Sequence, residues 1–252
     1  MVQLSVVIIT FNEERNLARC LESIKGIADE IVIVDSFSTD ATASISERFG
    51  ARFIQHPFAG YIEQKNFALS QAKNDCILSL DADEALSPEL KANILHVKSA
   101  WEADAYEMNR LTNYCGHWIR HGAWYPDRKV RLFNRKSGQW GGMNPHDRFI
   151  PVSPDKVKRI KGDILHYSYY AIQEHIAQGN KFSEIGAKAA FEKGKSATLF
   201  TLLWRPSFRF FRDFILLGGF LDGYYGYLIA RITAQATFLK YAKLRELGRK
   251  KS

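Results

Sequence analysis

Along the first hundred residues, continuous apolar runs alternate with segments whose apolar residues recur at helical spacing. Residues 4–10 are typical of the first kind, because a strand buried on both faces shows no period of two. Leu17, Cys20, Leu21 and Ile24 are spaced like one face of a helix. The alternation predicts an α/β fold with a mostly parallel, doubly wound sheet flanked by helices. The expected strands are 4–10, 31–34, 52–55 and 76–80, and the expected helices are about 17–24, 40–49, 62–73 and 88–100.

Polar side chains follow three of these predicted strands at the point where each strand ends. Asn12 and Glu13 come after the first strand, Asp35 ends the second, and Asp81 and Asp83 come after the fourth. The carboxyl ends of parallel strands meet at one edge of a sheet, and ligands of open α/β sheets bind there. We therefore expect these side chains to belong to one site.

The sequence Asp81-Ala82-Asp83 places two carboxylates two positions apart on a turn. Hard oxygen ligands of this kind suit Mg²⁺ or Mn²⁺, which commonly share their coordination with substrate phosphates. Such a cation would neutralise the charge that develops on a diphosphate leaving group. The alternative interpretation is a solvated acidic turn that caps the next helix.

The other strand ends predict contacts to a nucleotide. Asp35 can accept a hydrogen bond from the N3–H of uracil, and the segment that contains Thr10, Asn12 and Glu13 is expected to cover the base and ribose. The alternatives are that Asp35 caps its own turn and that Asn12 caps the first helix. Two basic residues, Lys65 and Arg128, are candidates to contact the diphosphate, although basic side chains are common on solvated faces.

Residues 106–151 show no dominant period apart from a short strand near 130–133, and they are rich in Gly, His and aromatic residues. We interpret this irregular segment as the acceptor side of the site. Asp147 is the candidate general base for an acceptor hydroxyl, and the alternative is a surface ion pair with Arg148. His166 is a candidate metal ligand beside Asp83, or else a core histidine packed among tyrosines.

The length of 252 residues allows one catalytic domain and a smaller appendage. We expect a catalytic domain at 1–170, with a nucleotide-sugar half at 1–100 and an acceptor half at 101–170, followed by a helical region at 171–252. The 3 cysteines are widely spaced and form no Cys-x-x-Cys, which predicts reduced thiols in a cytoplasmic protein.

Basic residues are concentrated at the end of the chain. Residues 188–252 hold 13 Lys and Arg against 4 Asp and Glu, a net of +9, whereas the whole chain carries +8. Within this segment an aromatic stripe runs beside an arginine stripe, which predicts an amphipathic helix lying in the headgroup layer of a membrane. The stripes are Phe200, Trp204, Phe208, Phe211 and Ile215, and Arg205, Arg209 and Arg212.

The expected partner of residues 198–251 is therefore an anionic membrane surface. The alternative is that the aromatic residues pack on the catalytic domain or on another subunit. The sequence contains no nucleic-acid-binding motif, so we expect no nucleic acid partner. Together with the reduced thiols, this pattern predicts a peripheral protein on the cytoplasmic face of the inner membrane.

Four segments together resemble the family 2 glycosyltransferases of GT-A fold: residues 5–13, 33–40 with Asp35, Gln64-Lys65-Asn66, and 80–84. Residues 125–133, His146-Asp147, 165–169 and 219–223 resemble a narrower branch, the bacterial lipopolysaccharide core glucosyltransferases of the WaaE/KdtX type. With this branch the resemblance covers nearly the whole chain.

The resemblance implies an inverting transferase that uses a UDP-sugar, often UDP-glucose, with Mg²⁺ or Mn²⁺ and a lipid-linked saccharide acceptor. It matches Asp35 to the uracil-binding position, Asp81 to the ribose side and Asp83 to the metal. The branch usually has His-Glu where this chain has His146-Asp147. Two alternatives remain open: a transferase that acts on a polyprenyl phosphate or another cell-envelope glycan, and a membrane-associated nucleotide-binding protein without catalytic activity.

Overall fold

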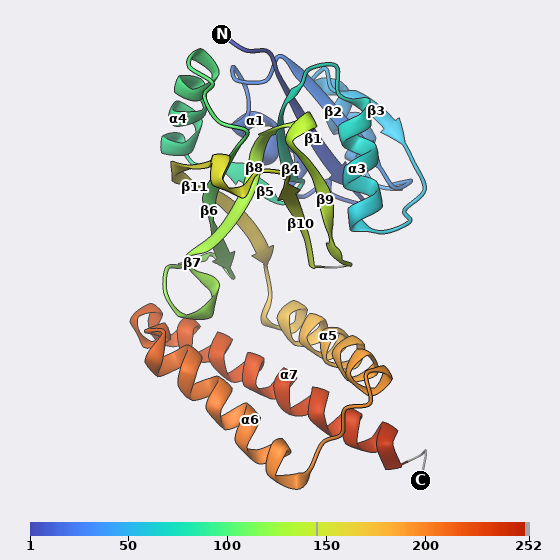
Figure 1. Cartoon of the computed structure of the whole chain (residues 1–252), viewed down its shortest axis with the longest axis vertical. Helices are drawn as coiled ribbons and strands as arrows, with labels where there is room; N and C mark the ends of the chain where they lie inside the picture. The colour runs from blue at the N-terminus through green and yellow to red at the C-terminus, as the bar shows by residue number, and fades with distance from the viewer. Residues whose placement is uncertain (145, 250–252) are drawn as a thin grey trace. The chain divides into compact units, whose positions relative to one another are not determined.

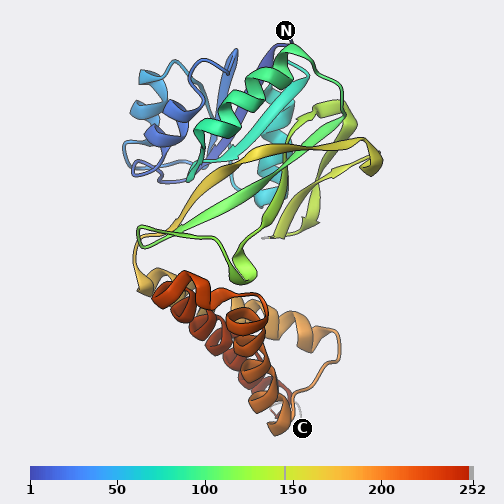
Figure 2. The same cartoon turned by 90° about the vertical axis from the view of Figure 1, so that its left-hand side faces the viewer.

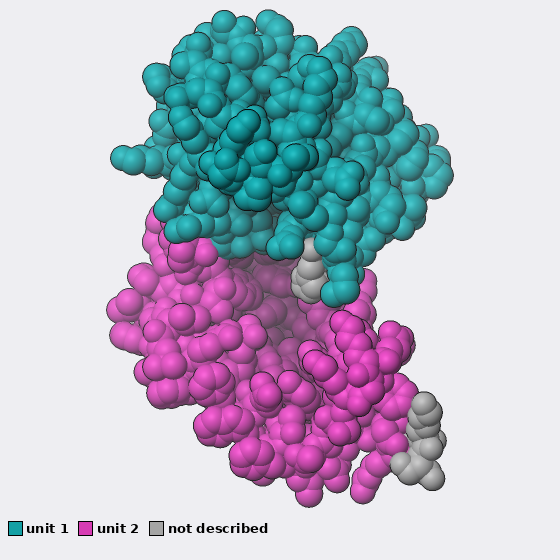
Figure 3. All heavy atoms as spheres, in the orientation of Figure 1, with its two compact units in different colours: residues 1–110, 127–167 teal, residues 111–126, 168–252 magenta. Residues whose placement is uncertain are grey.

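The computed structural model describes residues 1–144 and 146–249, and only the backbone of His146. The chain forms two compact units, residues 1–110 with 127–167 and residues 111–126 with 168–252, which Figure 3 shows in two colours. The predicted division at residue 170 differs from these units mainly in residues 111–126, which belong to the second unit.

The first unit is built on one sheet whose strands follow the order β3-β2-β1-β4-β8-β6-β11-β5. The strands from β3 to β4 in this order are parallel, whereas the pairs β4–β8, β6–β8 and β11–β5 are antiparallel. The strands are β1 (Leu4–Thr10), β2 (Glu30–Asp35), β3 (Arg52–Gln55), β4 (Cys76–Asp81), β5 (Glu84–Leu86), β6 (Ala105–Tyr114), β8 (Asp127–Asn134) and β11 (Val157–Tyr169).

Helices cover both faces of the sheet, as Figures 1 and 2 show. In β1, Val6 and Ile8 belong to one apolar cluster and Val7 to another, because successive side chains of a strand point to opposite faces. Leu21 and Leu90 join the first cluster and Leu69 joins the second. The helices are α1 (Leu17–Ser23), α2 (Thr42–Arg48), α3 (Tyr61–Gln71) and α4 (Pro88–Ser99).

The predicted α/β alternation is confirmed through residue 100, and the helix at α4 begins as expected, with Ser87 Oγ accepting from Leu90 N at 3.2 Å. The strand predicted near residues 130–133 is confirmed as part of β8. The prediction that the rest of the segment 106–151 is irregular is wrong, because most of it also forms strands. Besides β6 and β8, the segment contains β7 (His117–Ile119), β9 (Gly138–Met143) and β10 (His146–Pro151).

The hydrophobic pattern of the sequence does not reveal β6, β9 and β10, and the structure gives the physical reasons. β6 is buried at most positions without alternation, and its pairing with β8 shifts register between Tyr106 and Glu107. β9 and β10 pair only with each other, and glycines at 138, 141 and 142 leave β9 without a regular apolar face.

The second unit is dominated by three helices, α5 (Ile172–Glu192), α6 (Leu199–Phe211) and α7 (Gly223–Arg249). α7 packs against both α5 and α6. A cluster of aromatic side chains packs inside the second unit. Tyr114 OH and His175 Nδ1 are hydrogen-bonded at 3.1 Å, and the rings of Trp124 and Tyr169 pack around them. Among the described residues, every helix is too short or too polar to cross a membrane.

The register of the parallel strands brings the predicted polar positions to one edge. Thr10 pairs with Asp35 across β1 and β2, and Ile9 pairs with Asp81 across β1 and β4. The expectation that these strand ends meet at one edge of the sheet is therefore confirmed by the strand pairing.

Candidate functional site

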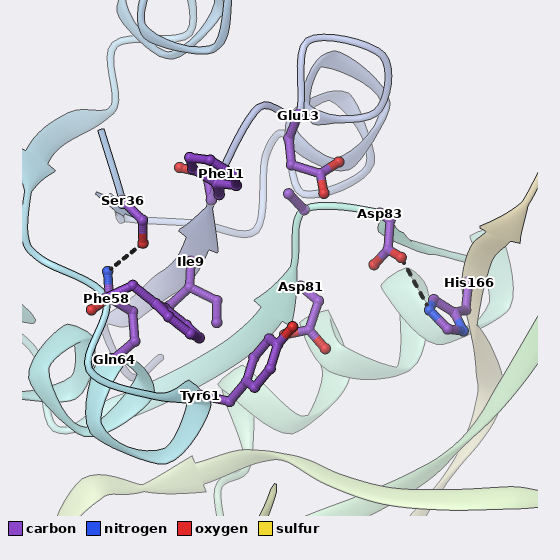
Figure 4. A pocket seen from close by; sticks show the side chains of 12 residues that line it. Ile9, Phe11, Glu13, Ser36, Phe58, Tyr61, Gln64, Asp81, Asp83 and His166 are labelled. Carbon is purple, nitrogen blue, oxygen red and sulfur yellow. Dashed lines mark hydrogen bonds and ion pairs between the residues drawn. The ribbon is translucent and has the colours of Figure 1, made fainter. Parts of the chain in front are cut away.

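A cleft of about 510 Å³ opens at the carboxyl ends of β1, β2 and β4, within the first unit. Its walls come from the loops after these strands, the start of α3 and one histidine of β11, as Figure 4 shows. Six residues of the predicted site line it: Thr10, Glu13, Asp81, Ala82, Asp83 and His166. The lining also contains Ile9, Phe11, Ser36, Phe58, Tyr61 and Gln64.

Asp83 and His166 face each other in the cleft, with Asp83 Oδ2 and His166 Nε2 3.1 Å apart (Figure 4). Tyr167 N donates to the Asp83 carbonyl at 2.9 Å, so the turn after β4 is fixed to β11 beside the histidine. The alternative of a core histidine packed among tyrosines does not describe His166, which lines the cleft.

Glu13 adds a third acidic side chain to the same cleft. Burial raises its pKa to about 6, against the lowering effect of a hydrogen bond from Asn16, and the nearby charge of Asp83 raises it further. The carboxylates of Glu13, Asp81 and Asp83 thus create a negative potential that a bound cation would relieve.

Asp81 is held between two buried cations. Its Oδ1 lies 2.9 Å from Lys65 Nζ, and its Oδ2 lies 2.7 Å from Arg131 Nη2. Burial alone would raise the pKa of Asp81, but Arg131 and Lys65 outweigh that effect and hold it well below its usual value. Asp81 is therefore ionised and fixed in orientation at the floor of the cleft.

The same network extends to Glu84, which is fully buried. Glu84 Oε1 accepts from Arg131 Nη2 at 2.9 Å, and its Oε2 accepts from Asp81 N at 2.9 Å. Burial would lower the pKa of the Arg131 guanidinium, yet Asp81 and Glu84 raise it above the ordinary arginine value. Arg131 thus ties β8 to the turn that carries Asp81 and Asp83.

The prediction that Lys65 contacts a diphosphate needs correction for this structure. The Lys65 side chain is 4% exposed, it is absent from the cleft lining, and its ammonium is engaged by Asp81 and by Asp147 Oδ2 at 2.7 Å. The sequence suggested, as an alternative to a catalytic role, that Asp147 forms a surface ion pair with Arg148. In the structure Asp147 pairs with Lys65 of α3. The backbone of its neighbour His146 is described, but the side chain is not.

Asp35 and Asn12 hold the loop after β2. Asp35 is buried, and its carboxylate accepts from Thr10 Oγ1 at 2.9 Å and from Ser38 N at 2.7 Å. These contacts correspond to the turn-capping alternative, and the uracil contact stays a prediction. Asn12 Oδ1 accepts from Thr39 N at 2.9 Å, so Asn12 fixes this loop and does not cap α1, whose N-cap is Asn16.

Arg128 lies apart from the cleft lining. Its side chain is 53% exposed and its Nη1 is 3.9 Å from Glu107 Oε1, a distance that indicates a weak ion pair at a solvated surface. The predicted diphosphate contact therefore finds no support in the geometry of the described residues.

Sequence reasoning missed Phe58 and Tyr61 as cleft residues and Arg131 as a charge partner. Phe58 and Tyr61 lie in the loop between β3 and α3 and at the first residue of α3, and their rings meet edge to face at 5.1 Å. Their position after a predicted strand was a usable signal, since that loop lies at the same sheet edge. Arg131 gave no such signal, because its pairing partners come from another strand.

A divalent cation fits the donor set at this edge. A carboxylate from Asp83 and an imidazole from His166 suit Mn²⁺ better than Mg²⁺, because Mg²⁺ prefers oxygen ligands alone. Within the described residues, no group of three or more His, Cys, Asp or Glu side chains is arranged so that it could hold a metal ion by itself. The protein ligands thus suit a cation whose remaining positions are filled by phosphate oxygens and water.

A sequence profile described as "Glycosyl transferase family 2" matches residues 5–159. An uncharacterised glycosyltransferase of Rickettsia typhi is 34% identical over 99% of this chain and 89% of its own length. The lipopolysaccharide core biosynthesis glycosyltransferase LpsC of Rhizobium meliloti is 32% identical over 96% of this chain and 91% of its own length.

Among solved structures, residues 1–349 of Staphylococcus aureus TarS resemble this chain with a TM-score of 0.48 and 14% identity, over 99% of this chain and 92% of that one. Glucosyl-3-phosphoglycerate synthase of Mycobacterium tuberculosis matches 44% of this chain and 44% of that one, with a TM-score of 0.37 and 22% identity. The sequence matches are the stronger of the two kinds of similarity.

Proposed function

The chain belongs to glycosyl transferase family 2, and from that premise we propose that it transfers a sugar from a UDP-sugar to an acceptor hydroxyl. The observation that carries the proposal is the cleft, where Glu13, Asp81, Asp83 and His166 meet at one edge of the sheet. Such an acidic edge suits a cation and a nucleotide diphosphate together.

In this proposal the nucleotide occupies the loops after β1 and β2, with Phe11 and Thr10 beside the base. Asp81, fixed by Lys65 and Arg131, would face the ribose, and Asp83 and His166 would hold Mn²⁺ or Mg²⁺. A cation there supplies charge neutralisation to the UDP leaving group. The two side chains that would hold the cation lie beside each other, with Asp83 Oδ2 3.1 Å from His166 Nε2.

Asp147 is the proposed base. The acceptor oxygen attacks the anomeric carbon as a carboxylate oxygen of Asp147 takes the hydroxyl proton, and the bond to UDP breaks with its electron pair leaving on the diphosphate, so that the configuration inverts. Among the described residues, only Oδ2 of Asp147 is engaged, by Lys65. Oδ1 is the oxygen that this step requires.

The proposed acceptor is a lipid-linked saccharide such as a lipopolysaccharide inner core, and UDP-glucose is the first donor to test. The similarity to LpsC, a lipopolysaccharide core biosynthesis glycosyltransferase, supports this acceptor class.

The function is tested by measuring nucleotide release and sugar transfer with a panel of UDP-, GDP- and CMP-sugars. We expect turnover with UDP-sugars alone, its loss in excess EDTA and its return with Mn²⁺, because the cation neutralises the leaving diphosphate. If GDP- or CMP-sugars are better donors, the uracil assignment of Asp35 is wrong. Binding of UDP without any sugar release would instead favour a nucleotide-binding protein.

We also propose that the second unit binds an anionic membrane surface, which would place the protein peripherally on the cytoplasmic face of the inner membrane. All five residues of the aromatic stripe are exposed, with Phe200 at 72% and Trp204 at 53%. Three aromatic rings stack in a row along α6: the ring centre of Trp204 lies 6.5 Å from that of Phe200 and 5.7 Å from that of Phe208. Residues 250 and 251 of the predicted segment lie outside the described residues.

The apolar surface continues beyond the predicted stripe. Exposed large side chains follow α6 through its π-helical end (Arg212–Leu216) and into α7: Leu216, Leu217, Phe220, Leu221, Tyr224 and Tyr227. The arginine stripe is partly neutralised, because Arg209 and Arg212 both pair with Asp213 at 2.6 Å. Arg205 forms no ion pair with the described residues, so it is the arginine best placed to meet anionic headgroups.

Vesicle binding tests this surface. We expect the protein to sediment with phosphatidylglycerol vesicles and less with neutral phosphatidylcholine, and the double variant Trp204→Glu/Phe208→Glu to bind at least about tenfold more weakly, because two aromatic side chains no longer enter the interface. Ile185→Glu, an exposed position on α5, is the matched control and should bind normally. Equal binding of all three proteins, or a dimer that dissociates only in the double variant, would refute lipid as the partner.

A further inference from the structure

The motif Gln64-Lys65-Asn66 on α3 contacts three separate parts of the active-site region. Gln64 Nε2 donates to Ser36 Oγ at 3.1 Å, in the loop after β2. Asn66 forms a pair of hydrogen bonds with the backbone of Trp140 on β9, each 3.0 Å long. Lys65 lies between these two contacts.

Lys65 pairs with one carboxylate on the donor side of the proposed reaction, Asp81, and with the proposed base, Asp147. Its ammonium lies 2.9 Å from Asp81 at the end of β4 and 2.7 Å from Asp147 on β10, and the side chain is 4% exposed. It also lies 4.5 Å from the centre of the Trp140 ring, whose other cationic neighbour is Arg131 at 5.4 Å. The ammonium is therefore enclosed by its two carboxylates and by the Trp140 ring.

The strands that carry Asp147 are also held to α3 at the turn that joins them, where Asn144 Oδ1 accepts from Ile62 N at 3.0 Å and Asn144 Nδ2 donates to Glu63 Oε2 at 2.9 Å. β9 and β10 form a two-stranded sheet separate from the main sheet. Phe149 and Trp140 secure its far end, where Phe149 stacks on Phe133 at 3.7 Å. At the near end Asp147 pairs with Gly142, which has no side chain to pack. Lys65 is the charged contact that fixes the carboxylate of Asp147 at that end.

We propose that Lys65 is a positioning residue, which sets the distance between the base Asp147 and the donor side of the cleft by bridging Asp147 and Asp81. The inference rests on the proposed function, because it needs Asp147 to act as the base. It replaces the expected diphosphate contact with a role in which Lys65 touches neither donor nor acceptor. Lys65 acts on the reaction only through the two carboxylates that it holds.

The proposal predicts a split between kinetic constants. In Lys65→Met, kcat should fall about 100-fold, because a misplacement of a catalytic group by roughly 1 Å has an effect of that size. The KM for the UDP-sugar should change little, since Arg131 still holds Asp81. Lys65→Arg, which keeps a cation between the two carboxylates, should recover part of the lost kcat.

A matched control comes from a second buried lysine of the same unit. Lys98 is also 4% exposed and pairs with Asp29 at 2.7 Å, in contacts that do not include the cleft residues. Lys98→Met removes a buried cation of the same kind, so it reports the general effect of the substitution on stability. We expect it to lower Tm as Lys65→Met does while leaving kcat unchanged.

A double-mutant cycle gives the decisive readout. If Lys65 acts through Asp147, the variant Lys65→Met/Asp147→Asn should be no slower than Asp147→Asn alone. Additive losses, or a Lys65→Met variant with a raised KM for UDP-sugar and a normal kcat, would overturn the proposal in favour of a donor contact. If Lys65→Met does not fold, Lys65→Arg measured in the same cycle decides it: non-additive losses support the proposal and additive ones refute it.

The cycle also separates two kinds of failure. An active Asp147→Asn variant would remove the general base and, with it, the basis of this inference. An inactive Asp147→Asn variant together with a fully active Lys65→Met variant would leave the proposed function intact and refute the positioning role alone.

Discussion

Asp147→Asn is expected to reduce sugar transfer to a hydroxyl acceptor by about 100- to 10,000-fold in kcat, the usual contribution of a general base. The amide cannot take a proton, but its oxygen can still accept a hydrogen bond from Lys65. The arrangement around Lys65, Asp81 and Arg131 should therefore survive, and the KM for the UDP-sugar should stay close to that of the wild type. Steady-state transfer assays on both proteins measure the effect.

The same variant decides between acceptor classes. A polyprenyl phosphate acceptor is already anionic and needs no base, so an enzyme of that kind would keep its activity in Asp147→Asn. Asp75→Asn is the control, because Asp75 also pairs with a lysine, Lys136 at 2.6 Å, but its side chain is 37% exposed and does not line the cleft. It should behave as the wild type does.

Arg131→Met should be the most destabilising single change in the charge network. Its side chain is 4% exposed, and its removal leaves the fully buried Glu84 with Arg110 at 3.6 Å as its remaining cation. Removing one partner of a buried ion pair costs about 3–5 kcal/mol, and here Glu84 would stay buried with only the longer contact to Arg110. For a chain of this size that corresponds to a fall in Tm of roughly 6–20 °C.

Thermal unfolding of Arg131→Met and Arg128→Met tests this prediction on one strand. Arg128 lies on β8 like Arg131, but its side chain is 53% exposed and its ion pair with Glu107 is long, at 3.9 Å. Exposed pairs contribute about 0–1 kcal/mol, so Arg128→Met should unfold close to the wild-type Tm. Equal Tm values for the two variants would show that the buried network does not stabilise the fold.

The nucleotide half of the fold could be predicted because its signals are local. The apolar run at residues 4–10 is itself the strand that it predicts. Asp35 and Asp81 stand directly at the ends of the strands that position them. Parallel pairing then places Asp35 and Asp81 at one edge without further information. For the same reason the cleft residues Thr10, Glu13, Asp81 and Asp83 were found from the sequence.

The rest of the site depends on contacts between distant segments. Lys65 and Asp147 are 82 positions apart, and Asp81 and Arg131 are 50 apart. A basic side chain in sequence gives no sign of whether it meets a substrate or a buried carboxylate, so Lys65 was assigned to the diphosphate. The strand that carries Asp147 was missed as well, because β10 pairs with β9, which is rich in glycine. Of the strand that carries Arg131, the sequence predicted only residues 130–133.

The central claim is that the cleft binds UDP together with a divalent cation held by Asp83 and His166. Calorimetric titration with UDP, with and without Mn²⁺, tests it directly in the wild type and in Asp83→Asn. We predict one saturable site whose affinity rises when Mn²⁺ is present, and loss of that rise in Asp83→Asn. Absence of UDP binding, or the same affinity with and without metal in both proteins, would contradict the account.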